Sequence, residues 1–175
     1  LNAKIIIDPF HIAQALNREL NRTRVRVMNQ HRYKDAKLYR KLKHYWKLIL
    51  KNSNELQNYK YNRYKLFESF ITSKGIVDYI LENNPSLKND YEVVHSLREC
   101  IQDRDYIEFK KTIEAATQLD LSPGLKRVLK TLMTYLPYIQ NTCEYPTRTN
   151  GPIEGINNKI KVLKRNAYGF RNYYH

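Results

Sequence analysis

The segment TNGPIEGINNKIKVLKRNAYGF, Thr149–Phe170, carries a helix signal that can be assigned almost residue by residue. Pro152 suits the first helical position, where its missing N–H costs nothing, and Gly169 suits the end of the helix. Apolar side chains recur at three- and four-residue steps, at Ile153, Ile156, Ile160, Leu163 and Ala167. This spacing predicts an amphipathic helix with one apolar stripe.

The opposite face of this helix is basic except for one acid. Residues 148–175 hold six Lys or Arg and a single carboxylate, Glu154. At about 100° per residue, that carboxylate shares a face with Asn158, Lys161 and Arg165. A lone acid on a basic helix fits a metal-dependent enzyme that acts on a polyanion. It fits equally well a surface acid that contacts neighbours one turn away.

The net charge of +14 is concentrated at the two ends of the chain. Residues 1–65 contain 16 bases and 4 acids, residues 66–147 contain 9 bases and 12 acids, and residues 148–175 are net +5. Basic regions of this size suit a nucleic-acid backbone, through release of counterions and long-range attraction. The alternative is a basic protein without a nucleic-acid role.

Length and composition predict one domain with a core of its own, or a large part of a longer protein. The chain has 175 residues and begins with Leu1, so we expect residues to be missing upstream. Cys100 and Cys143 have no CxxC spacing and indicate reduced thiols of an intracellular protein, with a disulfide between them as the alternative. No run is apolar enough to span a membrane.

Residues 3–8 predict a short buried strand, because three successive Ile residues are β-branched and apolar. Asp8 would then lie at the carboxyl end of that strand, where ligands and catalytic groups collect in sheets with helical crossovers. A helix is predicted from Pro9 to about Asn29. Its Arg18, Arg22 and Arg26 recur at four-residue steps, with Arg24 nearby, and predict a basic ridge.

The rest of the chain predicts helices, so the fold class is mainly α with one short N-terminal strand. Residues 32–65 interleave bases with aromatic residues, which favours either contact with DNA or an amphipathic cover on a core. Further helices are predicted over Lys65–Ser73, Ile76–Glu82, Pro85–Gln102, Asp105–Thr117 and Pro123–Gln140. Because a lone strand is not a stable sheet, its partner strands are expected upstream or in another copy.

Two blocks of this sequence resemble a known family. They are IIDPFH, ending at His11, and TNGPIEGINNKIK, ending at Lys161, followed by KRNAYGFRN, ending at Asn172. Together they resemble the C-terminal part of bacterial insertion-sequence transposases of the ISL-three group. These are DDE transposases with a ribonuclease-H-like catalytic core. The second block is long and fairly specific, whereas the first is short.

The resemblance implies a mechanism in which Asp, Asp and Glu side chains bind two Mg²⁺ or Mn²⁺ ions and cut and join DNA phosphodiesters. It matches Asp8 to the second Asp and Glu154 to the final Glu. We expect His11 and Asn157 to lie near these ligands without binding metal. The predicted DNA-binding residues are Arg18, Arg22, Arg26, Asn158, Lys161, Lys164 and Arg165, and the expected partner is double-stranded DNA at transposon ends.

The same resemblance divides the chain into residues 1–30 of the catalytic core, a helical insertion over 31–147 and the catalytic helix over 148–175. No residue matches the family's first Asp. We therefore expect a C-terminal fragment that is inactive alone, with its metal site empty and with possible self-association. Two other interpretations stay open: a non-enzymatic basic helical module that binds nucleic acid, and a Zn²⁺ hydrolase built on Asp8, His11 and Glu154.

Overall fold

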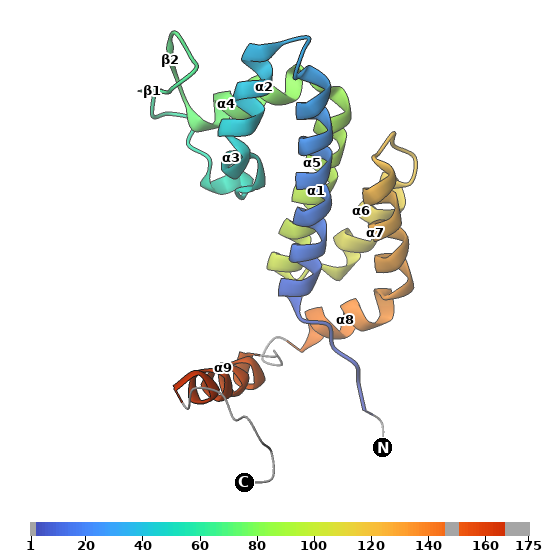
Figure 1. Ribbon diagram of the computed structural model, residues 1–175. Helices are drawn as coiled ribbons and strands as arrows, with labels where there is room; N and C mark the ends of the chain where they lie inside the picture. Colours follow the sequence, from blue (N-terminus) through green and yellow to red (C-terminus); the bar gives the residue numbers. More distant parts are fainter. Residues whose placement is uncertain (1–2, 146–150, 167–175) are drawn as a thin grey trace.

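The computed structural model describes residues 3–145 and 151–166, with the backbone alone for 151–154. Figure 1 shows a mainly helical protein, which confirms the predicted fold class. The helices from residue 9 to residue 144 share one hydrophobic core, in which Leu16, Leu97 and Phe109 are fully buried.

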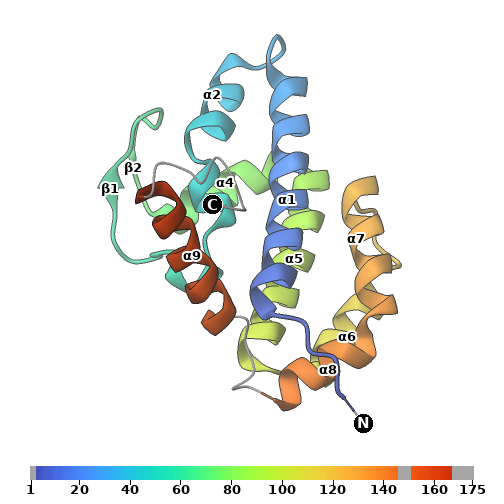
Figure 2. The ribbon, with the colours of Figure 1, turned by 60° about the horizontal axis from the view of Figure 1, so that its bottom comes forward.

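Two long helices, α1 (Pro9–His31) and α5 (Pro85–Asp103), lie side by side at the centre of this core (Figures 1 and 2). Each begins with a proline at its first position, as the sequence predicts. Leu16 and Leu20 of α1 are fully buried, as are Leu87 and Leu97 of α5. The apolar stripes of the two helices therefore form the main contact of the fold.

Shorter helices flank this pair on two sides. One side carries α2 (Ala36–His44), α3 (Trp46–Leu50), the 3₁₀ turn η1 (Ser53–Glu55) and α4 (Ser73–Glu82). The other carries α6 (Tyr106–Ala116), α7 (Pro123–Thr134) and α8 (Leu136–Glu144). Both views place α2 and α6 on opposite sides of the central pair (Figures 1 and 2).

The predicted helix over Lys65–Ser73 is wrong. This region instead contains a small antiparallel ribbon of β1 (Asn62–Arg63) and β2 (Phe70–Ile71), in which Asn62 pairs with Ile71. Leu66 adopts the left-handed conformation, with φ of 71°, which no α-helix can contain. The prediction followed helix propensity, which tertiary packing readily overrides in so short a segment.

The predicted helix over Pro123–Gln140 is two helices. α7 ends at Thr134, and α8 begins at Leu136 with a proline in its first turn. Pro137 has no N–H to donate to the preceding turn and its ring clashes there, so the continuous apolar stripe could not keep one helix intact.

Residues 3–8 form an extended segment, but the predicted strand pairs with no other strand in the described part of the chain. The segment lies along α8 instead. The Ile7 N–H donates to Thr142 Oγ1 at 3.0 Å, and Asn141 Nδ2 donates to the Ile5 carbonyl at 3.0 Å. Side chains of α8 thus form hydrogen bonds with backbone N–H and carbonyl groups of residues 5–7, as a neighbouring strand would in a sheet.

Helix α9 (Gly151–Asn166) confirms the helix predicted from the opening sequence segment. Its described side chains, from residue 155 to residue 166, are all exposed, and Figure 1 shows it as a rod apart from the helical core. Ile156, Ile160 and Leu163 of its apolar stripe are 58%, 44% and 64% exposed. The stripe is therefore not covered by the described residues of this chain.

Candidate catalytic residues and basic surfaces

Asp8 is held at the start of α1. Its Oδ1 accepts a hydrogen bond from the Phe10 N–H at 2.8 Å, so the carboxylate caps the helix. The side chain is half-buried, whereas Phe10 and His11 are exposed, with their rings 5.6 Å apart. The N-terminus of a helix favours a negative charge, so the position of this carboxylate is electrostatically compatible with α1.

The segment that leads to Asp8 is fixed against the segment that leads to α9. Lys4 Nζ lies 2.6 Å from the Tyr145 hydroxyl and 4.0 Å from Glu144 Oε2. Thr142 Oγ1 lies 2.8 Å from the Ile7 carbonyl oxygen. Two parts of the sequence more than 130 residues apart are thereby joined, one just before Asp8 and the other at the end of α8.

Glu154 lies in the first turn of α9, and its side chain is outside the described residues. Among the residues whose side chains are described, no three His, Cys, Asp or Glu are close enough to hold a metal ion. Farther along α9, Asn157, Asn158, Lys161, Lys164 and Arg165 are exposed. The basic residues predicted to contact DNA are therefore accessible.

The predicted ridge on α1 is present in part. Arg18, Arg22 and Arg26 are exposed on one side of the helix, and Arg22 pairs with the buried Glu19. Arg24 does not belong to the ridge, since it is only 8% exposed. Its guanidinium donates to the Leu42 carbonyl at 3.0 Å, and burial lowers its pKa. Arg24 thus connects α1 to the end of α2.

A groove between α1 and α7 extends this ridge to a residue that sequence analysis did not select. Arg22 and Arg26 line it from α1, and Arg127 lines it from α7, around a volume of about 230 Å³. The buried Glu19 lies against Gly124 at the start of α7, on the same groove. Arg127 reaches the groove because α7 packs on α1. The periodicity of residues within one helix does not predict such a contact between two helices.

The fold and these surfaces define a basic helical protein with Arg and Lys side chains on exposed faces. This class includes many proteins that act on nucleic acids. The family comparison is more specific. The chain belongs to the ISL3-type (ISL-three) transposase family, whose sequence model, described as a transposase, matches residues 1–175.

Two curated relatives are similar to this chain. The transposase for insertion sequence element IS1001 of Bordetella parapertussis is 30% identical over 174 residues, which is 97% of this chain and 39% of that protein. A Lactococcus lactis subsp. lactis protein named ATP-dependent protease is 36% identical over 113 residues, which is 65% of this chain and 36% of that protein. This chain thus spans less than two fifths of either relative.

These 175 residues contain no glycine-rich phosphate-binding loop. No solved structure matches the chain. No helix in the described part of the chain is both long and apolar enough to cross a membrane.

Proposed function

We propose that the complete protein cuts and joins DNA phosphodiesters during transposition of an insertion sequence, and that Asp8 and Glu154 are two of its three catalytic carboxylates. Membership of the transposase family supports the reaction class. The observation in the structure that supports the assignment is the junction between residues 4–7 and residues 141–145, since it joins the chain just before Asp8 to the chain leading to Glu154.

The donor chemistry fits divalent metal ions. Mg²⁺ and Mn²⁺ prefer hard oxygen ligands, and Asp8 and Glu154 offer carboxylate oxygens. When bound, two such ions supply an activated oxygen nucleophile and stabilise the leaving oxygen. Asp8 would bind them from a fixed helix N-terminus, and Glu154 from the first turn of α9. The third carboxylate belongs to a part of the protein outside these 175 residues, in keeping with the greater length of the relatives.

The remaining basic residues bind and orient double-stranded DNA at the transposon ends. Arg18, Arg22 and Arg26 of α1 and Asn158, Lys161, Lys164 and Arg165 of α9 contact backbone phosphates. His11 and Asn157 position the catalytic carboxylates.

The division into partial core, helical insertion and catalytic helix is part of this proposal, as is self-association of the complete transposase on paired ends. In the structure α1 packs on α5, α2 and α7 within the same core.

The test uses the complete transposase and a DNA fragment carrying its terminal repeat. Asp8→Asn and Glu154→Gln should each lower Mg²⁺-dependent strand cleavage by about three orders of magnitude or more and leave DNA affinity within about twofold. The matched control is Asp120→Asn, which changes an exposed acid of the α6–α7 link, and it should keep full activity. Cleavage at the normal rate by either carboxylate variant would refute the assignment.

A basic module that binds nucleic acid without catalysis is the second candidate, favoured by the exposed ridge on α1. It predicts that the 175-residue chain binds DNA with a steep salt dependence and that neither carboxylate affects Mn²⁺ binding. Strand transfer by the 175-residue chain alone would refute our expectation that it is inactive without the rest of the protein.

A further inference from the structure

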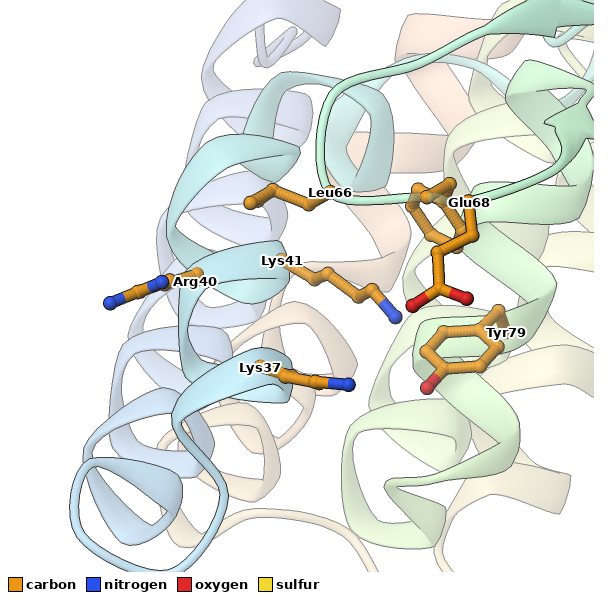
Figure 3. Close-up of a pocket in the computed structure, with 7 residues that line it drawn as sticks. Lys37, Arg40, Lys41, Leu66, Glu68 and Tyr79 are labelled. Carbon is orange, nitrogen blue, oxygen red and sulfur yellow. The ribbon is translucent and has the colours of Figure 1, made fainter.

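A cavity opens between α2, the turn before β2 and α4, away from the proposed catalytic residues (Figure 3). Its volume is about 460 Å³. Three cations of α2 line it, Lys37, Arg40 and Lys41, opposite Phe67, Glu68 and Tyr79. The wall contributed by one helix is thus positive, and the opposite wall is aromatic with one carboxylate.

Lys41 is the central feature of this cavity. Its side chain is only 9% exposed, and its ammonium group lies 4.1 Å from the centre of the Tyr79 ring and 4.5 Å from that of Phe67. The two rings pack edge to face, 5.5 Å apart. The ammonium is therefore held by the faces of two aromatic rings, which attract a cation but do not neutralise it.

No carboxylate forms an ion pair with Lys41, Lys37 or Arg40 among the described residues. Glu68 lines the cavity and, in Figure 3, extends toward Lys41, but it makes no ion pair there. Burial of a charge without a counterion costs free energy, which an anion entering the cavity would recover. Three cations against one carboxylate leave a net positive cavity that favours such an anion.

Contacts from neighbouring elements hold the wall of the cavity in place. Leu66 lies at its edge in the left-handed conformation, a strained backbone for a residue with a branched side chain. The Tyr45 hydroxyl donates to the Lys65 carbonyl and fixes the same turn to the end of α2. Tyr45 also contacts Phe67, with ring centres 5.8 Å apart. A preformed site binds its ligand at a lower entropic cost than a flexible one.

We propose that this cavity, which we call the Lys41 cavity, is a binding site for a phosphate group. Lys41 donates to the phosphate from the interior and Lys37 donates from the rim. The guanidinium of Arg40, which points away from Lys41 and Tyr79 in Figure 3, adds positive charge at the edge of the cavity. If the proposed function holds, on which this step rests, the phosphate belongs to the DNA backbone. Otherwise the same chemistry takes a free phosphate.

The first arm measures DNA binding by fluorescence anisotropy at several salt concentrations. Lys41→Met keeps the apolar stem of the side chain and should weaken binding about tenfold, with a salt slope lower by about one. Glu68→Gln should strengthen binding, because Glu68 is the one acid among the described residues that line the cavity. The control is Lys110→Met on α6, which removes the same charge from a distant helix surrounded by acids and should change affinity less than twofold.

The second arm measures the shift in melting temperature caused by inorganic phosphate. Lys41→Met should abolish a shift that wild type and Lys110→Met show. If Lys41→Met weakens DNA binding, with or without abolishing the shift caused by phosphate, the cavity binds a phosphate of the DNA backbone. If Lys41→Met abolishes only the shift caused by phosphate, the cavity binds a free phosphate. If the wild-type chain binds no DNA, the proposed DNA-binding role of this chain fails, and the phosphate arm decides the cavity by itself.

The inference is overturned if Lys41→Met and Glu68→Gln behave like Lys110→Met in both arms. Lys41→Met can also alter the fold, so its circular dichroism spectrum and melting temperature are compared with wild type. The exposed Glu68 gives a second, independent variant. A structural role for Lys41 alone does not predict tighter DNA binding by Glu68→Gln.

Discussion

At the scale of single residues, Asp90 is the buried acid that joins three helices. It is fully buried on α5, accepts from Thr23 Oγ1 of α1 at 2.7 Å, and accepts from the Ser122 N–H at the start of α7 at 2.9 Å. Asp90→Ala would leave two buried donors without an acceptor. We expect a loss of about 3 kcal/mol in the free energy of unfolding.

The measurement is urea denaturation followed by circular dichroism, with Asp120→Ala as the control. Asp120 is 96% exposed and lies 4.0 Å from Lys126, so its removal should change stability by less than about 0.5 kcal/mol. Equal effects of the two substitutions would show that Asp90 does not stabilise the fold through its hydrogen bonds.

His95 makes stability depend on pH. Its Nε2 lies 3.1 Å from the Ile49 carbonyl and its ring 4.0 Å from Tyr91, and burial lowers its pKa. As the pH falls to about 6.5, His95 therefore becomes protonated in the unfolded chain but stays neutral in the folded chain. The free energy of unfolding should then decrease as the pH drops below about 6.5. His95→Gln keeps a donor for Ile49 but does not titrate. Its unfolding free energy should vary less between pH 7.5 and pH 5.5, and an unchanged pH profile would contradict this role.

At the scale of elements, one hydroxyl provides two of the contacts that attach residues 4–7 to α8. Thr142 Oγ1 contacts both the N–H and the carbonyl of Ile7. Thr142→Val should therefore accelerate hydrogen exchange at the Ile7 amide by tenfold or more, for a loss of about 1.5 kcal/mol. Thr131→Val is the control, because the Thr131 hydroxyl bonds only to the Arg127 carbonyl of its own helix. Unchanged exchange at Ile7 would show that the hydroxyl does not hold this segment.

The ridge on α1 gives the prediction for DNA affinity. Arg18 and Arg26 are exposed and form no ion pair among the described residues, so they are available to phosphates. The double change Arg18→Gln and Arg26→Gln should lower the salt slope of DNA binding by about two. The change Lys110→Gln and Lys111→Gln removes the same charge from α6 and should leave the slope unchanged. Equal effects of both pairs would mean that net charge alone attracts DNA.

The sequence predicts those elements whose signals are local. Asn84-Pro85 and Ser122-Pro123 start helices where expected, because an N-cap followed by proline sets the first turn by itself. The small ribbon around Leu66 was missed, since it depends on packing of Phe67 against Tyr45 and Tyr79 from other elements. The burial of Arg24 was missed for the same reason, because its acceptor at Leu42 lies on another helix.

At the scale of the whole molecule, the separation of charge along the sequence follows the order of the helices. The basic first third of the chain forms α1, α2 and α3, and the acidic middle forms α4 to α8. Sequence alone identifies Asp8 and the bases of α9 as candidates, whereas the contact between residues 4–7 and 141–145 depends on long-range packing that no local signal predicts. The Lys41 cavity could not be predicted in full, because its aromatic wall comes from a turn and a helix beyond the base-rich segment.

The central claim, that Asp8 and Glu154 share one metal site, is tested most directly by titrating the ¹⁵N-labelled chain with Mn²⁺. Paramagnetic broadening should affect the amides next to both residues, such as His11 and Gly155, at the same Mn²⁺ concentration. Either Asp8→Asn or Glu154→Gln should remove the broadening from both places. Broadening at only one of the two, or at both with each substitution affecting only its own neighbours, would show that the carboxylates do not form a common site.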